Sequence, residues 1–358
     1  MEKEKTGILA FQKTLNYGAV LQLYALYITL SRMGKEPVII DYYNEKIENA
    51  EFPKLKSNTR PKALLRMFAF YAWTINKRKV FNLFERKHFE LTKEYNKNNF
   101  RDLEEELTKI IVGSDQVWNT NLTDGDMSYF LKGLSNKVGK HSYAASFGVG
   151  EANQLQATGK MASLLMEFKK IGVREFDGLK IVDTLAQRKG VLNLDPTFLL
   201  TRSQWQQFAS EQKAEKPYLL LYFLKDKNKI EQGKEYAKGK GLKVKYISTH
   251  PFVRRGIETI RDASPEKFIS LVMNATAIIT GSYHGFILAL NFNVPVSVDF
   301  ERGRYNKNSR LNSIQLLFEI DDIIEGACDS IDFFDNFTKV NEKLMSLREE
   351  SIDFLKGI

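Results

Sequence analysis

The sequence predicts an α/β protein made of two halves, each a parallel sheet with helices on both faces. Short apolar strands alternate with helical segments near the start of the chain and again after residue 217. With 358 residues, the chain is too long for one ordinary hydrophobic core. Between residues 190 and 217 the alternation gives way to a proline turn, a short helix and a charged stretch, and there we expect the two halves to join.

In the first half, "TGILAFQ" and "EPVIIDYY" are strand patterns on either side of a helical pattern that ends at Gly34. A strand, a helix and a second strand within about 40 residues form a βαβ unit, so the sheet is parallel and the crossover right-handed. The segments "KIIVGSD", "HSYAASFG" and "IGVREF" predict three further strands.

The second half repeats the alternation, with strands predicted at "YLLLYFL", "KVKYIST", "TAIITG" and "VPVSVDF". We expect an N-terminal domain at 1–195 with a basic, aromatic helical insertion at about 44–105. A C-terminal domain follows at 196–335, and a helix at 336–358 packs back toward the first domain. Ligands of such sheets bind at the carboxyl ends of the strands, so the expected site is the cleft between the halves.

The composition indicates a cytoplasmic protein. Cys328 is the single cysteine, so the chain forms no internal disulfide and no cysteine-rich zinc site. The start, "MEKEKTGILAFQ", is unlike a secretory signal, and no apolar run reaches the ~20 residues that span a bilayer. One glycine after the first strand is not a dinucleotide fingerprint, and no second ligand stands at metal spacing from His284. We therefore expect no nicotinamide or flavin cofactor and no metal.

The positive charge is concentrated in one segment. The net charge is +9, and residues 54–98 contain 12 lysines and arginines against 3 acidic residues, which accounts for all of it. This segment is also aromatic, so residues 60–87 are a candidate for docking on an anionic membrane. The alternative is a helical pair with a solvated cationic face and an aromatic underside packed on the domain. No nucleic-acid motif accompanies the charge, so we expect no nucleic-acid partner.

Two polar stretches follow predicted strands of the first half. In "KTLNYGAVLQ", Asn16 and Gly18 precede a helix whose free amides would favour an anion; the alternative is a tight turn. In "VGSDQVWN", Asp115 is a candidate base or partner for a hydroxyl. Equally, Ser114 or Asp115 would cap a helix that begins there.

Two more stretches carry a cation or a histidine. Arg174 in "IGVREF" offers a guanidinium to a carboxylate or phosphate, or else forms a salt bridge with Glu175 or Asp177. His284 in "TGSYHG" lies at the start of a helix, whose dipole favours the neutral imidazole, whereas a bound phosphate would reverse that preference. The histidine would then act as base or acid according to the ligand, although a lone histidine is more often structural.

Taken in order, "NYGAVLQLYAL", "IVGSDQVWN", "SYAASFG", "VRE", "LDPTFLL" and "TGSYHG" resemble the polysaccharide pyruvyl transferase family over roughly residues 6–320. The resemblance implies two Rossmann-like halves similar to the GT-B glycosyltransferases. It also implies transfer of pyruvate from phosphoenolpyruvate to two hydroxyls of a sugar, as a ketal, with release of phosphate. The acceptor would be a polysaccharide or a lipid-linked glycan precursor, and no cofactor is needed beyond the co-substrate.

The resemblance also assigns roles at the matching positions. His284 would be the acid/base and a donor contact, Arg174 would bind the donor carboxylate or phosphate, and Asp115 would contact the acceptor hydroxyl. Further donor contacts are expected at Ser282, Tyr283, Gly285, Asn16 and Gly18, and acceptor contacts at Gln116 and Asn119.

One position departs from the family pattern. Some members carry an arginine two residues before the histidine, where this chain has Ser282. The stretch "ERGRYNKNSR" follows the next strand, and we expect Arg302 or Arg310 from it to supply the missing charge. The alternative is a solvated basic loop.

Two other functions stay open on the sequence. A GT-B glycosyltransferase would use a nucleotide sugar as donor on the same fold, and a non-catalytic glycan-binding protein would have kept the fold without the chemistry. For the enzyme, we expect a location at the inner face of the membrane, through peripheral contact of residues 54–98.

Overall fold

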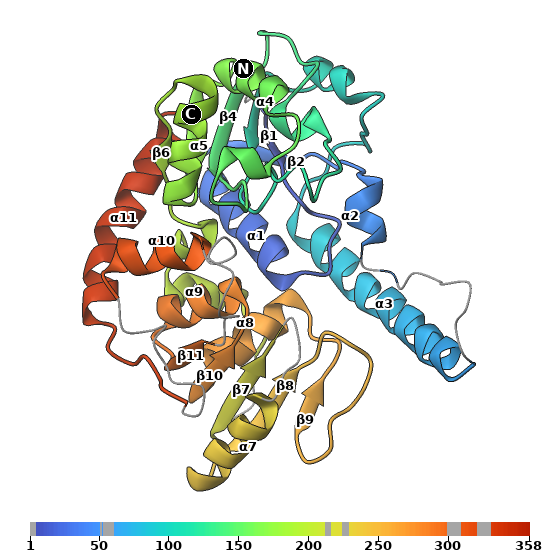
Figure 1. Ribbon diagram of the computed structural model, residues 1–358, viewed down its shortest axis with the longest axis vertical. Coiled ribbons are helices and arrows are strands. Elements are labelled where there is room, and N and C mark those ends of the chain that lie inside the picture. The colour runs from blue at the N-terminus through green and yellow to red at the C-terminus, as the bar shows by residue number, and fades with distance from the viewer. Residues whose placement is uncertain are drawn as a thin grey trace.

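The computed structural model describes residues 5–50, 52, 61–211, 216–223, 229–298, 309–320 and 331–358. Two parallel sheets, one above the other, form the body of the molecule (Figure 1). This confirms the predicted fold class. The domain boundaries at 195 and 335 stay a prediction.

The first sheet has the strand order β2-β1-β3-β4-β5-β6, and every neighbouring pair is parallel. Its strands are β1 (Lys5–Leu9), β2 (Glu36–Ile39), β3 (Lys109–Val112), β4 (Gly139–Ala145), β5 (Lys170–Val173) and β6 (Val191–Leu192). The inner strands are buried almost throughout, which explains the apolar run "IIV" in β3, while β4 also buries Lys140 and His141.

The second sheet has the order β11-β10-β7-β8-β9, again parallel throughout. Its strands are β7 (Tyr218–Tyr222), β8 (Lys243–Ile247), β9 (Glu258–Ile260), β10 (Ala277–Thr280) and β11 (Val296–Val298). In each sheet the chain reverses its direction of winding once, between β1 and β3 in the first and between β7 and β10 in the second. Ligands of such sheets bind at these switch points.

Helices cover both sheets. Those associated with the first are α1 (Tyr17–Arg32), α2 (Glu45–Asn49), α3 (Pro61–His88), α4 (Thr158–Met166) and α5 (Phe176–Ala186). The others are α6 (Arg202–Phe208), α7 (Lys229–Gly239), α8 (Pro265–Met273), α9 (Tyr283–Phe292), α10 (Ser309–Phe318) and α11 (Thr338–Lys356). Short 3₁₀ helices lie at η1 (Phe100–Glu105), η2 (Met127–Phe130), η3 (Ala152–Gln154) and η4 (Pro196–Phe198).

The two halves share part of one core. The ring of Tyr17, in the first turn of α1, stacks on Phe268 of α8 with ring centres 4.5 Å apart, and its hydroxyl donates to the carbonyl of Ala263 at 2.8 Å. Burying two aromatic rings on each other stabilises the closed arrangement. The first turns of α1 and of α9 are thereby held close together.

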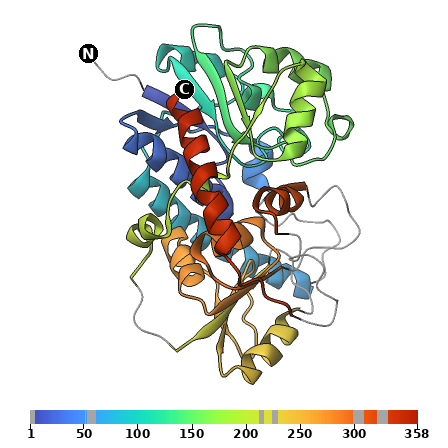
Figure 2. The same cartoon turned by 90° about the vertical axis from the view of Figure 1, so that its left-hand side faces the viewer.

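Helix α11 returns to the first half, as Figure 2 shows. The hydroxyl of Ser351 accepts from the backbone N–H of Leu194, and the ring of Phe354 lies 6.2 Å from that of Tyr143 in β4. The Arg348 guanidinium donates to the carbonyl of Phe198 at 2.6 Å. The C-terminal helix therefore links the segment after β6 to the first sheet.

Residues 61–88 of the basic segment form one long helix, α3, and not the helical pair considered from the sequence. No described helix is both long enough and apolar enough to cross a membrane.

Candidate active site

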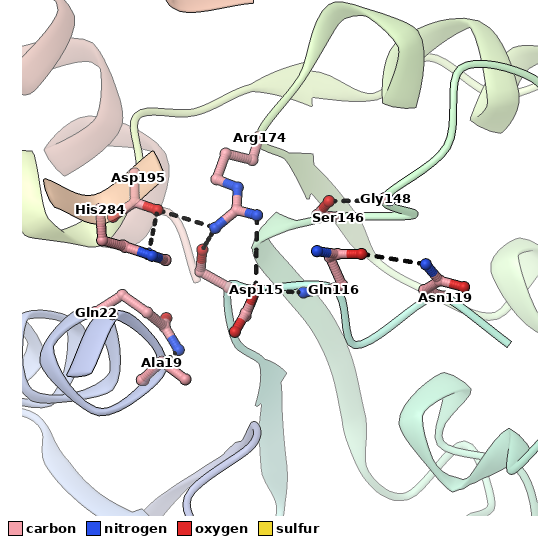
Figure 3. Close-up of polar contacts among 12 residues, drawn as sticks. Ala19, Gln22, Asp115, Gln116, Asn119, Ser146, Gly148, Arg174, Asp195 and His284 are labelled. Carbon is pink, nitrogen blue, oxygen red and sulfur yellow. Dashed lines mark hydrogen bonds and ion pairs between the residues drawn. The ribbon is translucent and has the colours of Figure 1, made fainter. Parts of the chain in front are cut away.

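The candidate site lies where the carboxyl ends of strands from both sheets meet (Figure 3). Asp115 follows β3, Arg174 follows β5, Asp195 follows β6, and His284 lies in the first turn of α9, which follows β10. All four side chains are buried.

Arg174 is the centre of this group. Its Nη1 donates to Asp195 Oδ2 at 3.0 Å and to Ser114 Oγ at 3.3 Å, and its Nε donates to Glu175 Oε1 at 2.9 Å. The salt bridge to Glu175 considered from the sequence is therefore present. Burial acts to lower the pKa of Arg174, but the surrounding negative groups, Glu175 foremost, raise that pKa overall. The guanidinium stays charged inside the protein.

Part of that guanidinium is still free. Nη2 of Arg174 is buried and has no hydrogen-bond partner among the described residues. The nearest carboxylate oxygen to Nη2 is Oδ1 of Asp115, at 3.8 Å. A buried charged donor without a partner is costly unless a ligand or water satisfies it, so this edge of Arg174 is suited to an anion.

His284 lies flat against bare backbone at the start of α1. A Cβ atom added to Gly18 would lie 2.0 Å from Nδ1 of His284, so only glycine leaves room for the imidazole. Nε2 of His284 is 3.4 Å from Asp195 Oδ2 but forms no hydrogen bond with a described residue. The structure thus brings together two residues that are 266 positions apart in the sequence.

Asp115 has an unusual backbone conformation. Its φ is 77°, in the left-handed region that residues other than glycine seldom occupy. The N–H of Ser146 donates to the Asp115 carbonyl at 3.0 Å and holds the turn in place. Strain of about 1–3 kcal/mol at such a residue persists where the surroundings enforce it, and this is frequent at functional sites. Turns follow Asp115, so the helix that it was expected to cap does not begin here.

A second arginine reaches the site from α10. The Cζ atoms of Arg174 and Arg310 lie 5.0 and 5.4 Å from the ring centre of Tyr283. Burial lowers the pKa of Arg310, and the charge of Arg174 lowers it further, while the carboxylates of Asp115 and Glu175 act in the opposite sense. Of the two arginines expected to replace the missing charge, Arg310 lies beside the site and is not part of a solvated loop. Arg302 lies outside the described residues.

Other predicted site residues hold the local backbone. Asn16 caps α1 by accepting from the N–H of Gly18 at 3.0 Å, and Ser282 caps α9 by accepting from Gly285 at 3.4 Å. A Cβ on Gly285 would lie 2.5 Å from the hydroxyl of Thr280, so the close packing of α9 on β10 requires glycine. These contacts shape the two helix starts that flank His284.

Gln116 and Asn119, the predicted acceptor contacts, bond to each other. Nδ2 of Asn119 donates to Oε1 of Gln116 at 3.1 Å. This pair packs on Gly148, where an added Cβ would lie 2.1 Å from Gln116 Oε1. In the part of the chain that the structure describes, no group of histidine, cysteine, aspartate and glutamate side chains could hold a metal ion.

Comparison with known proteins decides the family. The model of the polysaccharide pyruvyl transferase family matches residues 16–298, which include every element of the site except α10. The chain belongs to the polysaccharide pyruvyl transferase family. A search of curated protein sequences finds no match.

Similar solved structures are distant in sequence. A putative UDP-N-acetylglucosamine 2-epimerase from Listeria monocytogenes is 11% identical, with 99% of this chain and 90% of that chain covered and a TM-score of 0.50. UDP-GlcNAc 2-epimerase from Methanocaldococcus jannaschii is 13% identical, with 97% and 99% covered and a TM-score of 0.49. Heptosyltransferase II from E. coli is 10% identical, with 97% and 99% covered and a TM-score of 0.37. These neighbours have the GT-B fold, and the likeness concerns the fold alone.

Sequence reasoning assigned no role to Asp195, although this pyruvyl transferase family member places it between Arg174 and His284. Its Oδ1 accepts from the N–H and the hydroxyl of Thr197 at 3.0 and 2.8 Å. Burial acts to raise the pKa of Asp195, but His284, Arg174 and the Thr197 N–H lower that pKa below its ordinary value. The available signal was "LDPTFLL", an aspartate directly after a strand and before a proline.

A polar cavity of about 270 Å³ lies beside the loop that leads into Asn16 and Gly18. It is lined by Lys13, Asp41, Glu48, Arg78 and Glu85, among others. Burial, with a contribution from Asp41, raises the pKa of Glu85 to about 7. The sequence analysis missed this cavity because its residues come from the ends of β1 and β2 and from α3, three segments with no common pattern.

Proposed function

We propose that this chain transfers pyruvate from phosphoenolpyruvate to two hydroxyls of one sugar, in a polysaccharide or a lipid-linked glycan precursor, and releases phosphate. The observation that carries the proposal is the pair of guanidinium groups, Arg174 and Arg310, that share the ring of Tyr283 next to His284. Phosphoenolpyruvate bears a carboxylate and a phosphate close together, and guanidinium groups bind both kinds of anion.

The chemistry requires one proton at the donor's methylene carbon and the loss of one proton from each attacking hydroxyl. In the first step a proton adds to the methylene carbon, the neighbouring carbon becomes an oxocarbenium-like centre, and one sugar hydroxyl adds to that centre. In the second step the carbon–oxygen bond to phosphate breaks, phosphate leaves with the electron pair, and the second hydroxyl adds. The two hydroxyls lose two protons in all. One makes up for the proton that the new methyl group gained, and the other protonates the released phosphate.

We assign the first proton transfer to His284. Its Nε2 lies 3.4 Å from Oδ2 of Asp195 but forms no hydrogen bond with a described residue, so this nitrogen is available to pass a proton to the donor. Asp115 takes the proton of the attacking hydroxyl, since its carboxylate lies 3.8 Å from Nη2 of Arg174 and so beside the proposed anion site. Arg310 supplies the positive charge that an arginine at the position of Ser282 supplies in some members.

For the acceptor we propose the cavity lined by Lys13, Asp41 and Glu85 rather than the Gln116–Asn119 pair. Carboxylates and cations around a cavity of 270 Å³ match the hydroxyls of one sugar unit. Oε1 of Gln116 and Nδ2 of Asn119 already bond to each other, so these two atoms are not available to a ligand.

The test is calorimetric titration of the purified chain with phosphoenolpyruvate and, separately, with a panel of nucleotide sugars. We expect phosphoenolpyruvate to bind and the nucleotide sugars not to bind. His284→Gln keeps a polar group of similar size at this position. Its affinity for phosphoenolpyruvate should therefore fall by a smaller factor than its rate of phosphate release with an acceptor. Binding of a nucleotide sugar alone would overturn the proposal in favour of a GT-B glycosyltransferase.

A further inference from the structure

Helix α3 exposes several large apolar side chains on the side that faces away from the protein. Its other side packs on the body, where Thr74, Phe81 and Phe84 are buried. A helix that lies on a surface is normally polar on its outward side, and a helix apolar all round is normally buried. α3 is neither fully buried nor polar on its outward side. We therefore expect a partner to cover the exposed apolar side chains.

The outward apolar residues of α3 form a stripe. Leu65, Phe68, Ile75 and Leu83 are separated by three, seven and eight residues, steps that return to one side of an α-helix. Their exposed fractions are 74%, 60%, 37% and 67%. In Figure 1 the first turns of α3 reach out beyond the two sheets, which places this end of the helix within reach of a large flat partner.

A loop of the second half extends the same surface. Between β8 and β9, Phe252 and Val253 are 43% and 64% exposed. The Cζ of Arg66 lies 5.9 Å from the ring centre of Phe252, and Nε1 of Trp73 donates to the carbonyl of Arg261 at 2.8 Å, so the loop is next to α3. We call Leu65, Phe68, Ile75, Leu83, Phe252 and Val253 the α3 surface.

Positive charge surrounds the α3 surface. Residues 61–88 contain seven lysines and arginines and one glutamate. Arg66 and Lys79 of α3 are exposed, as is Arg255 of the loop. The charge favours an anionic partner, and a second copy of the chain would bring the same positive charge against this one.

We propose that the α3 surface docks on an anionic phospholipid bilayer. The apolar stripe inserts among the headgroups and upper acyl chains, and the flanking arginines and lysines contact lipid phosphates. The helix lies in the plane of the interface and does not cross the bilayer. The inference does not depend on which donor the enzyme uses, although it would bring the site close to a lipid-linked acceptor.

The test is flotation of the purified chain with two kinds of vesicle, phosphatidylcholine alone and phosphatidylcholine mixed with phosphatidylglycerol. We expect flotation only with the anionic vesicles, and less of it at high salt because screening weakens the charged contacts. The double variant Leu65→Glu, Phe68→Glu should lower the partition coefficient about tenfold or more, since both side chains leave the apolar phase.

A matched control is Met345→Glu on α11, where the replaced side chain is 66% exposed. It should float like the wild type. Lys79→Glu with Arg255→Glu should weaken flotation mainly at low salt. Because all these positions are exposed, circular dichroism should show unchanged folding in every variant.

Three results would overturn the proposal. One is no flotation with anionic vesicles at low salt, and another is equal flotation of the double variant and the wild type. The third is a lipid-free dimer, seen in sedimentation velocity, that the double variant breaks, because the surface would then bind a second copy of the chain. None of these experiments involves phosphoenolpyruvate, so their failure is distinguishable from failure of the proposed function.

Discussion

The two sides of the site differ in how completely their polar groups are paired. On the first-half side, Arg174 forms hydrogen bonds or ion pairs with Asp195, Glu175 and Ser114. On the second-half side, Nε2 of His284 lies 3.4 Å from Oδ2 of Asp195 without a hydrogen bond to a described residue, and the guanidinium of Arg310 lies over the ring of Tyr283. The difference indicates that the first side is mainly a rigid frame with one free edge, at Nη2 of Arg174, and that the second side offers more of its groups to the ligand.

Removing Arg174 should have the largest effect on the frame. Arg174→Ala leaves buried carboxylates, Asp195 among them, without their cation, and breaking a buried pair in this way costs about 3–5 kcal/mol. We expect the free energy of unfolding, measured by denaturant titration, to fall by that amount. Arg310→Ala is the comparison and should cost about 1 kcal/mol or less. If the two variants lose the same unfolding free energy, the two sides of the site do not differ in the way described.

Gly18→Ala tests the contact between the sides. The new Cβ would lie 2.0 Å from Nδ1 of His284, so the ring or the helix must move. We expect a loss of about 1–3 kcal/mol in unfolding free energy, as for other overpacked sites, together with weaker donor binding.

Gly159→Ala is the matched control for that variant. It lies in α4, where an added Cβ meets nothing within 4 Å. It should stabilise the helix by up to about 1 kcal/mol and leave donor binding unchanged. A neutral Gly18→Ala would show that His284 is free to move away from α1.

The pH dependence of stability should separate Arg174 and its partners from the proposed acceptor cavity. Burial raises the pKa of Glu85 to about 7 in the folded state, whereas the unfolded chain has the ordinary, lower pKa. Between these two pKa values the folded state keeps a proton that the unfolded state has lost. The contribution of Glu85 therefore lowers the free energy of unfolding by up to about 3 kcal/mol as the pH rises from about 4.5 to 7.

Glu85→Gln should remove this pH-dependent loss, which thermal unfolding at pH 5 and pH 8 would measure. Glu90→Gln is the control, because Glu90 is exposed and pairs with Lys5 at the surface. For Asp195 the sign is opposite: its lowered folded-state pKa stabilises the protein above about pH 4, and that stability is lost only as the pH falls further. A Glu85→Gln profile identical to the wild type would exclude Glu85 as the source.

Much of the fold followed from the sequence because parallel strands buried on both faces leave continuous apolar runs such as "KIIV" and "AIIT". The positions of Asp115, Arg174 and His284 followed for a related reason, since a polar residue directly after such a run lies at the carboxyl edge of its sheet. Asp195 was given no role because the short strand before it, β6, lies within the predicted junction between the halves.

Other features depend on contacts that no local pattern records. The fit of His284 against Gly18 depends on how the two halves pack, and the two residues are 266 positions apart in the sequence. The outward stripe of α3 shows only once the buried side of the helix is known, because apolar residues occur on both sides. Composition located the segment, and the packing decided which of its side chains are exposed.

The most direct test of the central claim is donor binding by Arg310→Ala, measured by calorimetric titration with phosphoenolpyruvate alongside Arg101→Ala, an exposed arginine away from the site. Loss of one charge-assisted contact should weaken binding about tenfold to a hundredfold in Arg310→Ala. Arg101→Ala should bind like the wild type. Unchanged affinity in Arg310→Ala would contradict the account, because the second guanidinium at Tyr283 would then have no part in holding the donor.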